Sequence, residues 1–282
     1  MDTDIDQANA RFRGWTCELL AQAAEHFSLA LLGDPEFGWR DRSIGSRVRD
    51  VDSDRWLRVV TSHSVWANGE FWTGNLDSSV IHGVPKPVVL QVHEWTEEPR
   101  IIRAELMTYV PGRVCSDTQE LRDELDLPDE WWTSLRHALD ILVTHRTKRV
   151  GATQEGISRR LHAFSGDKID TTVTTWNTAH GDLQRANLTA PAPYLLDWEG
   201  WGIAPAGYDA ATLYCYSLLA PDPARGVYET FAYILDTPDG TRAQLHVIGR
   251  LLPRVDGGDY PNLASPLHQH AQHLLSKQGV TS

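Results

Sequence analysis

The chain has 282 residues, enough for one large domain or two smaller ones. Hydrophobic residues make up 41% of it and charged residues 23%, an ordinary globular composition that excludes a largely disordered chain. Asp and Glu number 38 against 26 Lys and Arg, and the resulting net charge of −12 argues against binding to nucleic acid or to an anionic membrane surface.

The cysteines and the N-terminal segment indicate the compartment. Cys17, Cys115 and Cys215 lie far apart without a Cys-x-x-Cys pair, so the sequence predicts neither a disulfide framework nor a thiolate zinc site. Residues 1–6 are acidic where a signal peptide is basic, and the apolar run at 214–220 is too short to span a bilayer. We therefore expect a cytoplasmic protein that does not cross a membrane.

The first half of the chain is predicted to be rich in strands. Apolar residues at helical spacing predict a helix over 6–32, which Gly33-Asp34-Pro35 would end. Short alternating runs separated by turn residues then predict five strands, with one helix over 68–81 between the third and the fourth. The strands are expected at 37–43, 46–51, 55–61, 88–95 and 100–109.

The second half has mainly helical periodicity. Helices are expected to begin at Ser116-Asp117 and at Pro128 and to cover 153–164, 210–219, 226–235 and part of the tail. A loop region over 180–207 contains strand-like pieces at 187–189 and 194–197. With Pro111-Gly112 as the boundary, the sequence predicts an α+β protein with a strand-rich lobe at 1–110 and a helical lobe at 111–282.

The residues best suited to chemistry lie between His180 and Asp197. His180-Gly-Asp-Leu-Gln-Arg-Ala-Asn187 is followed ten residues later by Asp197 in Leu-Leu-Asp-Trp-Glu. Asp182, Asn187 and Asp197 offer hard oxygen ligands of the kind that suit Mg²⁺, and Asp182 can orient the proton of an attacking hydroxyl. Taken singly, such residues also form Asx turns, but the full spacing favours a catalytic site.

This pair of motifs resembles the catalytic core of the aminoglycoside phosphotransferases and related choline-kinase-like enzymes, the phosphotransferase enzyme family of small-molecule kinases. The resemblance covers about residues 37–220 and is strongest at 180–213. It implies a bilobal protein-kinase-like fold, with a five-stranded antiparallel sheet and one helix in the N-lobe and a mainly helical C-lobe.

The resemblance assigns roles to residues of the helical lobe. Asp182 matches the family's catalytic Asp, which orients the acceptor hydroxyl. Asn187 and Asp197 match the two ligands that hold Mg²⁺ on the nucleotide phosphates. Asp209, in the pair Tyr208-Asp209, resembles an Asp that braces the catalytic loop through backbone hydrogen bonds.

In the strand-rich lobe the resemblance implies a nucleotide site. Arg58, in Trp-Leu-Arg-Val, matches a basic residue that touches the phosphates, and a guanidinium clamps phosphate oxygens well. Glu70 is placed to be its helical partner. Ser46 lies in a presumed phosphate loop, Ser43-Ile-Gly-Ser46, which has a single glycine and is equally well explained as a hairpin turn.

The segment 106–112, Leu-Met-Thr-Tyr-Val-Pro-Gly, resembles the hinge that binds the purine. The backbone of Thr108 and Val110 would hydrogen-bond the base, and Met107 would stand beside it. Because such recognition uses backbone groups, ATP and GTP remain equally open as the phosphoryl donor.

The implied activity is Mg²⁺-dependent transfer of a γ-phosphate to a hydroxyl of a small molecule, most simply an antibiotic or related natural product that is thereby inactivated. Residues 240–282 contain only Asp256 and Asp259 as acids, a poor match to a polycationic acceptor. Aminoglycosides, nucleosides, other antibiotics, sugars and amino alcohols therefore stay open. The alternatives are a metabolic sugar or amino-alcohol kinase and a nucleotide-binding pseudokinase or scaffold, which the single-glycine loop favours.

Overall fold

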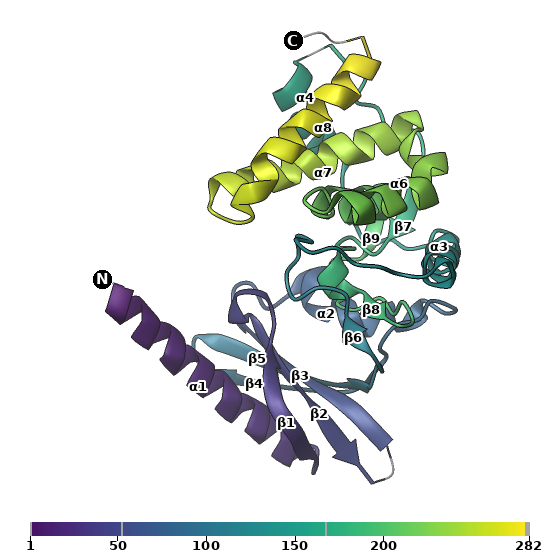
Figure 1. The fold of residues 1–282 in the computed structure, drawn as a ribbon. Coiled ribbons are helices and arrows are strands. Elements are labelled where there is room, and N and C mark those ends of the chain that lie inside the picture. Colours follow the sequence, from purple (N-terminus) through teal and green to yellow (C-terminus); the bar gives the residue numbers. More distant parts are fainter. Residues whose placement is uncertain (1, 52, 167, 280–282) are drawn as a thin grey trace. The chain divides into compact units, whose positions relative to one another are not determined.

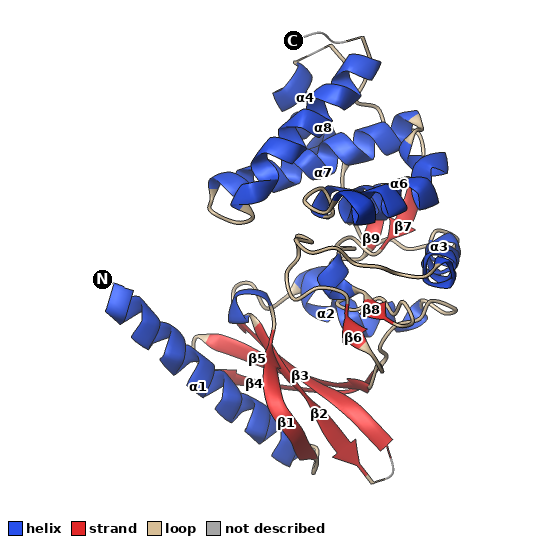
Figure 2. Cartoon of the chain, viewed as in Figure 1, coloured by secondary structure: helices blue, strands red, loops and turns tan. Residues whose placement is uncertain are grey.

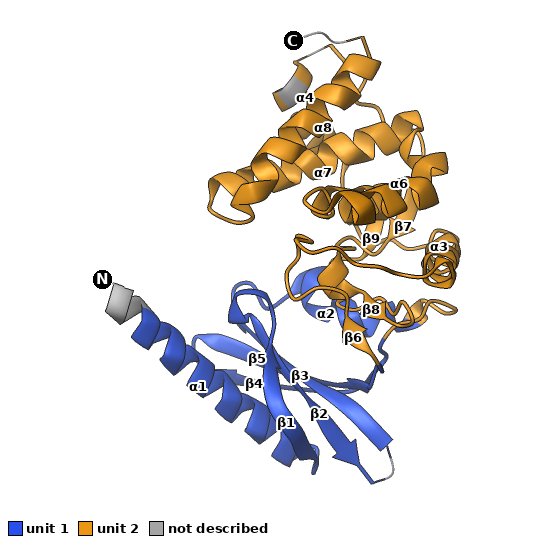
Figure 3. Cartoon of the chain, viewed as in Figure 1, with its two compact units in different colours: residues 1–79, 87–111 blue, residues 80–86, 112–282 orange. Residues whose placement is uncertain are grey.

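A computed structural model describes residues 2–51, 53–166 and 168–279 (Figure 1). Contacts divide the chain into two units, shown in Figure 3. The first comprises residues 1–79 and 87–111, and the second comprises 80–86 and 112–282. The short segment 80–86 thus belongs to the second unit although it interrupts the first. The assignment of nucleotide and acceptor binding to the two parts stays a prediction.

A five-stranded antiparallel sheet forms the first unit, as the sequence predicts (Figure 2). Its spatial order is β1-β2-β3-β5-β4, so the last two strands form a hairpin whose second strand pairs with β3. The strands are β1 (Ala30–Phe37), β2 (Ser43–Asp50), β3 (Ser53–His63), β4 (Val89–Glu97) and β5 (Arg100–Thr108). Helix α2 (Gly69–Asp77) and the 3₁₀ turn η2 (Ser78–Val80) follow β3 and confirm the helix predicted at 68–81.

Helix α1 (Asp2–His26) packs its apolar residues on this sheet. Leu19, Leu20 and Ala23 are buried in one cluster with side chains of β2, β3 and β5, among them Leu57 and Ile102. Apolar side chains alternate along these strands because successive residues of a strand point to opposite faces. The core of the first unit therefore lies between α1 and the sheet.

The predicted end of the first helix and the first predicted strand are both wrong. The helix ends at His26 rather than residue 32, because Ser28 takes a left-handed φ of 57° and Leu29 N–H returns to Ala24 O at 2.9 Å. Residues 30–37, apolar in part, form strand β1, where β2 pairs their backbone groups. The expected strand at 37–43 is instead a turn containing the 3₁₀ helix η1 (Trp39–Asp41).

Helices dominate the second unit, as predicted. They are α3 (Asp129–Leu142), α4 (Gln154–Ser165), α5 (Tyr208–Tyr216), α6 (Pro221–Leu235), α7 (Pro238–Asp256) and α8 (Ala264–Lys277). Short strands form two pairs, β6 (Arg113–Val114) with β8 (Thr189–Ala190) and β7 (Trp176–Ala179) with β9 (Gly202–Pro205). The 3₁₀ turns η3 (Arg185–Asn187) and η4 (Pro261–Leu263) complete the unit.

Helix α7 is central to this unit's core. It contacts α4, α5, α6 and α8, and in Figure 1 it lies between α6 and α8. Ala243, Leu245, Val247, Ile248 and Leu251 of α7 are all fully buried. A helix that is apolar on so much of its surface is stabilised by neighbours on several sides, so α7 fixes the positions of the elements around it.

Two expectations for the second unit are corrected. The short helix expected at Ser116-Asp117 is absent, because Ser116 Oγ accepts the Thr118 N–H at 3.2 Å and closes a local turn instead. Strands β7 and β9 were not anticipated, since runs of four residues show little periodicity. Among the described residues no helix is both long and apolar enough to cross a membrane.

The buried histidine of α7 generates a prediction about acid stability. Burial, with Arg160 and Arg250 nearby, lowers the pKa of His246 to about 3. An unfolded chain takes up this proton as the pH falls below about 6.5, whereas the folded chain does not. The free energy of unfolding should therefore fall with decreasing pH by up to about 1.4 kcal/mol per pH unit on account of this residue.

We expect His246→Gln to flatten this pH dependence, as measured by urea unfolding between about pH 5 and 7. His268→Gln is the matched control, because His268 is exposed on α8. Equal slopes for the wild type and His246→Gln would contradict the prediction.

Candidate active site

The His180–Asn187 loop begins where β7 ends, and a buried carboxylate holds its first turn. Asp209, in the first turn of α5, accepts the backbone N–H groups of His180 at 2.7 Å and Gly181 at 3.0 Å. Burial raises the pKa of the Asp209 carboxyl, with His180, the two N–H donors and Arg250 opposing it. The predicted bracing role of Asp209 is confirmed.

Gly181 is required at this turn by both its conformation and its surroundings. Its φ is +89°, and a Cβ atom there would lie 2.3 Å from the carbonyl oxygen of Gly200. A side chain would therefore push the loop away from the segment that follows Asp197. The glycine lets these two parts of the site approach each other closely.

The imidazole of His180 links the two motifs. Its Nε2 lies 2.8 Å from Leu196 O and its Nδ1 lies 3.4 Å from Asp182 N, while the ring meets Trp198 edge-on at 4.8 Å. Burial lowers the pKa of His180, which favours a neutral ring. With the proton on Nε2, the ring donates to Leu196 O and accepts the Asp182 N–H.

Leu196, the residue before Asp197, is therefore held from both ends of the first motif. Its N–H donates to Asn187 O at 2.9 Å, while its carbonyl faces His180. A bridge between Leu188 and Leu195 continues the pairing. Asp197 itself is exposed and takes a left-handed φ of 59°, a conformation that costs energy for a non-glycine residue and is frequent at functional sites. The fold thus brings Asn187 and Asp197 together.

Asp182 and Asn187 are in direct contact. Asn187 Nδ2 donates to Asp182 O at 2.9 Å and lies 3.4 Å from Asp182 Oδ2. Since the amide nitrogen is committed to Asp182, the oxygen Oδ1 is the atom of Asn187 that can bind a cation. The Asp182 side chain keeps 30% of its surface exposed, so it remains accessible to a reactant.

The loop after Asp197 is fixed by a buried arginine. Arg149 donates from Nε to Trp201 O and from Nη2 to Glu199 O, both at 3.0 Å, and its guanidinium lies 4.7 Å from the Trp201 ring centre. Arg149 is only 8% exposed. These contacts hold the chain on the C-terminal side of Asp197, in addition to the contact of His180 with Trp198.

Comparisons with known proteins identify the fold. No protein-family model matches the chain, and no curated protein matches its sequence. Among solved structures, a thermostable mutant of aminoglycoside phosphotransferase APH(4)-Ia, in ternary complex with ADP and hygromycin B, superposes with a TM-score of 0.63 at 12% identity, covering 94% of this chain and 99% of that one. The chain has the protein-kinase-like fold of small-molecule phosphotransferases.

A putative kinase for a different substrate has the same fold. A putative fructosamine-3-kinase from Haemophilus somnus gives a TM-score of 0.53 at 10% identity, covering 92% of this chain and 96% of that one. The same APH(4)-Ia enzyme with AMP-PNP and hygromycin B gives 0.62 at 12% identity over 94% and 99% of the two chains. The resemblance drawn from the His180–Asp197 motifs is thus confirmed at the level of fold.

Within this kinase-like fold, the first unit places Arg58 on β3 opposite Glu105 of β5. Arg58 Nη1 lies 3.3 Å from Glu105 Oε2, an atom that also accepts Asn75 Nδ2 of α2 at 3.0 Å. Arg103 donates to the other oxygen, Oε1, at 2.9 Å. Glu105 is the buried centre of this network, which sequence reasoning missed because strand pairing alone puts residues 58 and 105 side by side. Pairing of Arg58 with Glu70 stays a prediction.

The expected phosphate loop at Ser43–Ser46 is wrong, because these residues belong to strand β2. Ser46 is 1% exposed, and its hydroxyl donates to Arg47 O at 3.1 Å, so the side chain is committed to backbone. The turn between β1 and β2 covers 38–42 instead, where Arg40 and Asp41 have positive φ. The alternative interpretation of 43–46 as a hairpin turn is wrong for the same reason, because the hairpin turn lies at 38–42.

The predicted hinge lies at the end of β5. Met107 is buried and Thr108 is the last residue of the strand. The Thr108 N–H donates to Val88 O at 2.9 Å and its hydroxyl accepts the Val88 N–H at 2.9 Å. That N–H group is therefore already committed, and contact of Val110 with a purine stays a prediction.

Arg185, within the His180–Asn187 motif, is an unanticipated buried cation. It is fully buried, and its guanidinium lies 5.4 Å from the ring centre of Trp131 and 4.8 Å from that of Trp132. Burial lowers its pKa to about 10, so it stays charged at neutral pH. The two indole faces of α3 stabilise this charge and tie η3, with Asn187, to that helix.

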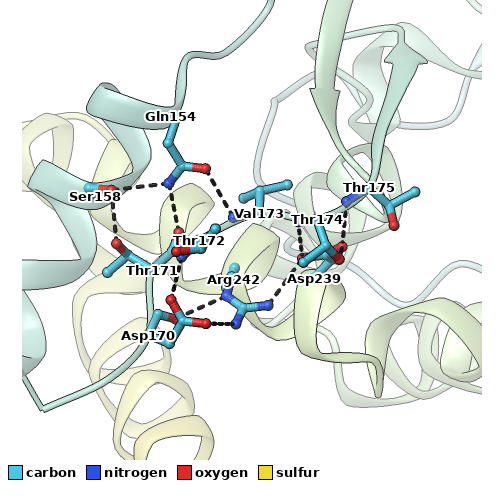
Figure 4. Close-up of polar contacts among 10 residues, drawn as sticks. All are labelled: Gln154, Ser158, Asp170, Thr171, Thr172, Val173, Thr174, Thr175, Asp239 and Arg242. Atoms are coloured by element: carbon cyan, nitrogen blue, oxygen red, sulfur yellow. Dashed lines mark hydrogen bonds and ion pairs between the residues drawn. The ribbon is translucent and has the colours of Figure 1, made fainter.

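A polar network anchors the chain that leads into β7 (Figure 4). Asp239, at the start of α7, accepts Thr174 N–H at 3.0 Å, Thr174 Oγ1 at 2.7 Å and Thr175 N–H at 2.8 Å. Arg242 joins this carboxylate to Asp170 through bonds of 3.1 and 2.9 Å. Burial alone raises the pKa of Asp239, but the bonds from Thr174 and Thr175 outweigh it and hold the pKa below its ordinary value.

Helix α4 extends the same network. Gln154 Nε2 donates to Thr171 O at 2.8 Å, and its Oε1 accepts the Val173 N–H at 2.9 Å, as Figure 4 shows. Ser158 Oγ lies 2.8 Å from Thr171 Oγ1. The segment 170–175 is thereby fixed against two helices just before it enters β7 and the catalytic loop.

We predict that Asp239→Ala lowers the free energy of unfolding by about 3 kcal/mol, because four donors lose a charged acceptor. The difference from wild type should hold above about pH 4 and shrink at lower pH, where the wild-type carboxyl also loses its charge. Urea unfolding measures it, with Asp236→Ala as the control expected to change little, because Asp236 is exposed at the end of α6 and its side chain accepts a hydrogen bond only from the exposed Tyr228 hydroxyl among the described residues. Equal decreases in the free energy of unfolding for the two variants would contradict the prediction that the Asp239 network stabilises the fold.

Proposed function

We propose that the protein is a small-molecule kinase that transfers the γ-phosphate of ATP or GTP to a hydroxyl group. The observation that carries this proposal is the pair of hydrogen bonds that Leu196 makes with His180 and with Asn187. These bonds bring the His180–Asn187 loop beside the segment that carries Asp197. The fold shared with phosphotransferases supports it, because neighbours with this fold bind ADP or AMP-PNP together with hygromycin B. Because the reaction uses a nucleoside triphosphate, we propose a cytoplasmic location.

In this proposal Asp182 orients the acceptor hydroxyl for in-line attack on the γ-phosphorus. Its carboxylate is partly exposed, and its position is set by the Asn187 amide and by the backbone contact with His180. Phosphoryl transfer of this kind depends mostly on positioning and electrostatics, so a rigid carboxylate suits it. No covalent enzyme intermediate is needed.

The residues fit a bound Mg²⁺. Asn187 has its amide oxygen to offer, because its nitrogen is taken by Asp182, and Asp197 presents an exposed carboxylate from an adjacent backbone position. Both are hard oxygen donors, which Mg²⁺ prefers along with phosphate oxygens and water. When bound there, the ion neutralises charge on the nucleotide phosphates.

We assign nucleotide binding in the first unit to Arg58 and to the segment 107–110. Glu105 binds the Arg58 guanidinium, and the Arg58 side chain retains 15% exposure, through which it can reach phosphate oxygens. Glu70 is proposed as a further contributor from the first turn of α2. Ser46 is left out, because its hydroxyl is buried in β2.

For the acceptor we propose a hydroxylated antibiotic or related natural product, with resistance by phosphorylation as the biological outcome. The likeness to an enzyme crystallised with hygromycin B supports this class. A metabolic sugar kinase is the second candidate, favoured by the likeness to a putative fructosamine-3-kinase. A panel of both acceptor classes, followed by mass spectrometry for one added phosphoryl group, separates the two.

The nucleotide site is tested first by thermal unfolding with ATP and with GTP, each with and without Mg²⁺. A ligand that binds only the folded chain at a hundredfold excess over its Kd stabilises it by about 2.7 kcal/mol. We expect a magnesium-dependent rise in Tm with at least one nucleotide. Absence of a shift with either nucleotide would contradict the kinase and also its pseudokinase alternative.

Asp182→Asn tests the catalytic assignment. We expect turnover to fall by a factor of about 10² to 10⁴, because the acceptor hydroxyl loses the carboxylate that orients it, while the nucleotide-induced rise in Tm persists. Asp222→Asn, an exposed Asp in the first turn of α6, is the control. Nucleotide binding with no turnover in the wild type on any acceptor would favour a pseudokinase.

A further inference from the structure

A second charged group lies beside the candidate catalytic carboxylate. Arg250 of α7 places Nη2 3.7 Å from Asp182 Oδ1 and donates from Nη1 to Gly181 O at 3.2 Å. Its side chain is 23% exposed, while its Nε and Nη2 atoms are buried and make no hydrogen bond with any residue in the described part of the chain. The guanidinium also lies 5.6 Å from the Tyr208 ring centre.

Asp182 is consequently held on two sides. Arg250 lies toward Oδ1 and the Asn187 amide lies toward Oδ2, at 3.7 and 3.4 Å. Both distances exceed those of a close hydrogen bond, so neither group saturates the carboxylate. Lone pairs remain on both oxygens for a hydroxyl, while rotation of the side chain would separate it from one partner or the other.

The arginine is fixed independently of Asp182. It lies eleven residues after Asp239, about three helical turns along α7. Asp239 binds the chain just before β7, and Arg250 binds the chain just after it (Figure 4 shows the former contact). One rigid helix therefore contacts the segments at both ends of the strand that delivers Asp182.

Stability alone is a weak explanation for this ion pair. Taking a guanidinium out of water carries a desolvation penalty. Burial accordingly lowers the pKa of Arg250, but Tyr208, Asp182 and other neighbours outweigh it and raise the pKa above its ordinary value. An apolar side chain at this position would fill the space without that penalty. The value of the charge lies in what it does to Asp182.

We propose that Arg250 is a positioning residue of phosphoryl transfer, which holds the Asp182 carboxylate in the orientation that receives the acceptor hydroxyl. It acts through Asp182 and Gly181 and does not itself contact the reacting atoms. This inference rests on the proposed kinase function. Misplacement of a catalytic group by about 1 Å can lower turnover about a hundredfold, so loss of Arg250 is expected to reduce kcat by about ten- to a hundredfold.

The test compares Arg250→Met, Arg250→Gln and Arg250→Lys with wild type. Release of ADP from MgATP is measured with water and with hygromycin B as acceptors, and Kd for MgATP is measured by thermal shift. Met and Gln are expected to lower kcat alike with unchanged Kd, and Lys is expected to restore part of it. Gln keeps a donor for Gly181 O without the charge, so full activity in Arg250→Gln would overturn the proposal. Arg225→Met, on exposed α6, is the control.

A double-mutant cycle with Asp182→Asn then tests whether Arg250 acts through Asp182. We expect Arg250→Met to cost little more in the Asp182→Asn background, because the group it positions is already gone. Losses that multiply would overturn the proposal. If wild type binds MgATP yet releases no ADP with water, with hygromycin B or with any acceptor of the panel described above, the proposed function fails and this inference with it. If wild type is active and Arg250→Met is equally active, only this inference fails.

Discussion

The candidate site depends on a buried, neutral imidazole between two segments of the chain. His180 spans Leu196 O and Asp182 N, and the Leu196 N–H in turn reaches Asn187 O. Protonation would remove the acceptor at Nδ1, and burial opposes it by lowering the pKa of His180. Because backbone groups are the partners, the constraint positions the main chain before Asp197 rather than a flexible side chain. The contacts of Leu196 with His180 and Asn187 therefore set the backbone positions of the two candidate metal ligands, Asn187 and Asp197.

Helix α7 provides a second set of contacts that fix the His180–Asn187 loop. Its start is joined to the chain before β7 through Asp239, and its later turns reach the chain after β7 through Arg250. The helix is buried along much of its length, so it cannot shift without disturbing the core of the second unit. In the proposed function, a carboxylate held between such fixed points needs little reorganisation when a reactant arrives, which is the condition under which electrostatic positioning is most effective.

In the first unit, the buried charge is a carboxylate that accepts several hydrogen bonds. Glu105, 1% exposed, collects Arg58, Arg103 and Asn75, which come from β3, β5 and α2. A buried carboxylate with several donors avoids the cost of an unsatisfied charge and ties the helix to the sheet. Arg58 is thereby presented from a fixed strand position. In the second unit, no carboxylate among the described residues hydrogen-bonds the buried guanidinium of Arg185, and two indole rings lie against it instead.

The sequence by itself determined the class of fold, the presence of five antiparallel strands and most helices. It also identified Asp182, Asn187 and Asp197 as candidate site residues. These follow from local periodicity and from spacing within a short motif. Strand β1 was misplaced, because the apolar run after His26 fits a helix as well as a strand, and only pairing with β2 decides between them. Ser46 was assigned to a loop because Ser43-Ile-Gly-Ser46 resembles a phosphate loop, whereas pairing with β1 and β3 makes these residues part of β2. The partners of these residues, Glu105 for Arg58 and Arg250 for Asp182, lie 47 and 68 positions away in the chain. Such pairs carry no local pattern, since tertiary packing alone brings them within reach.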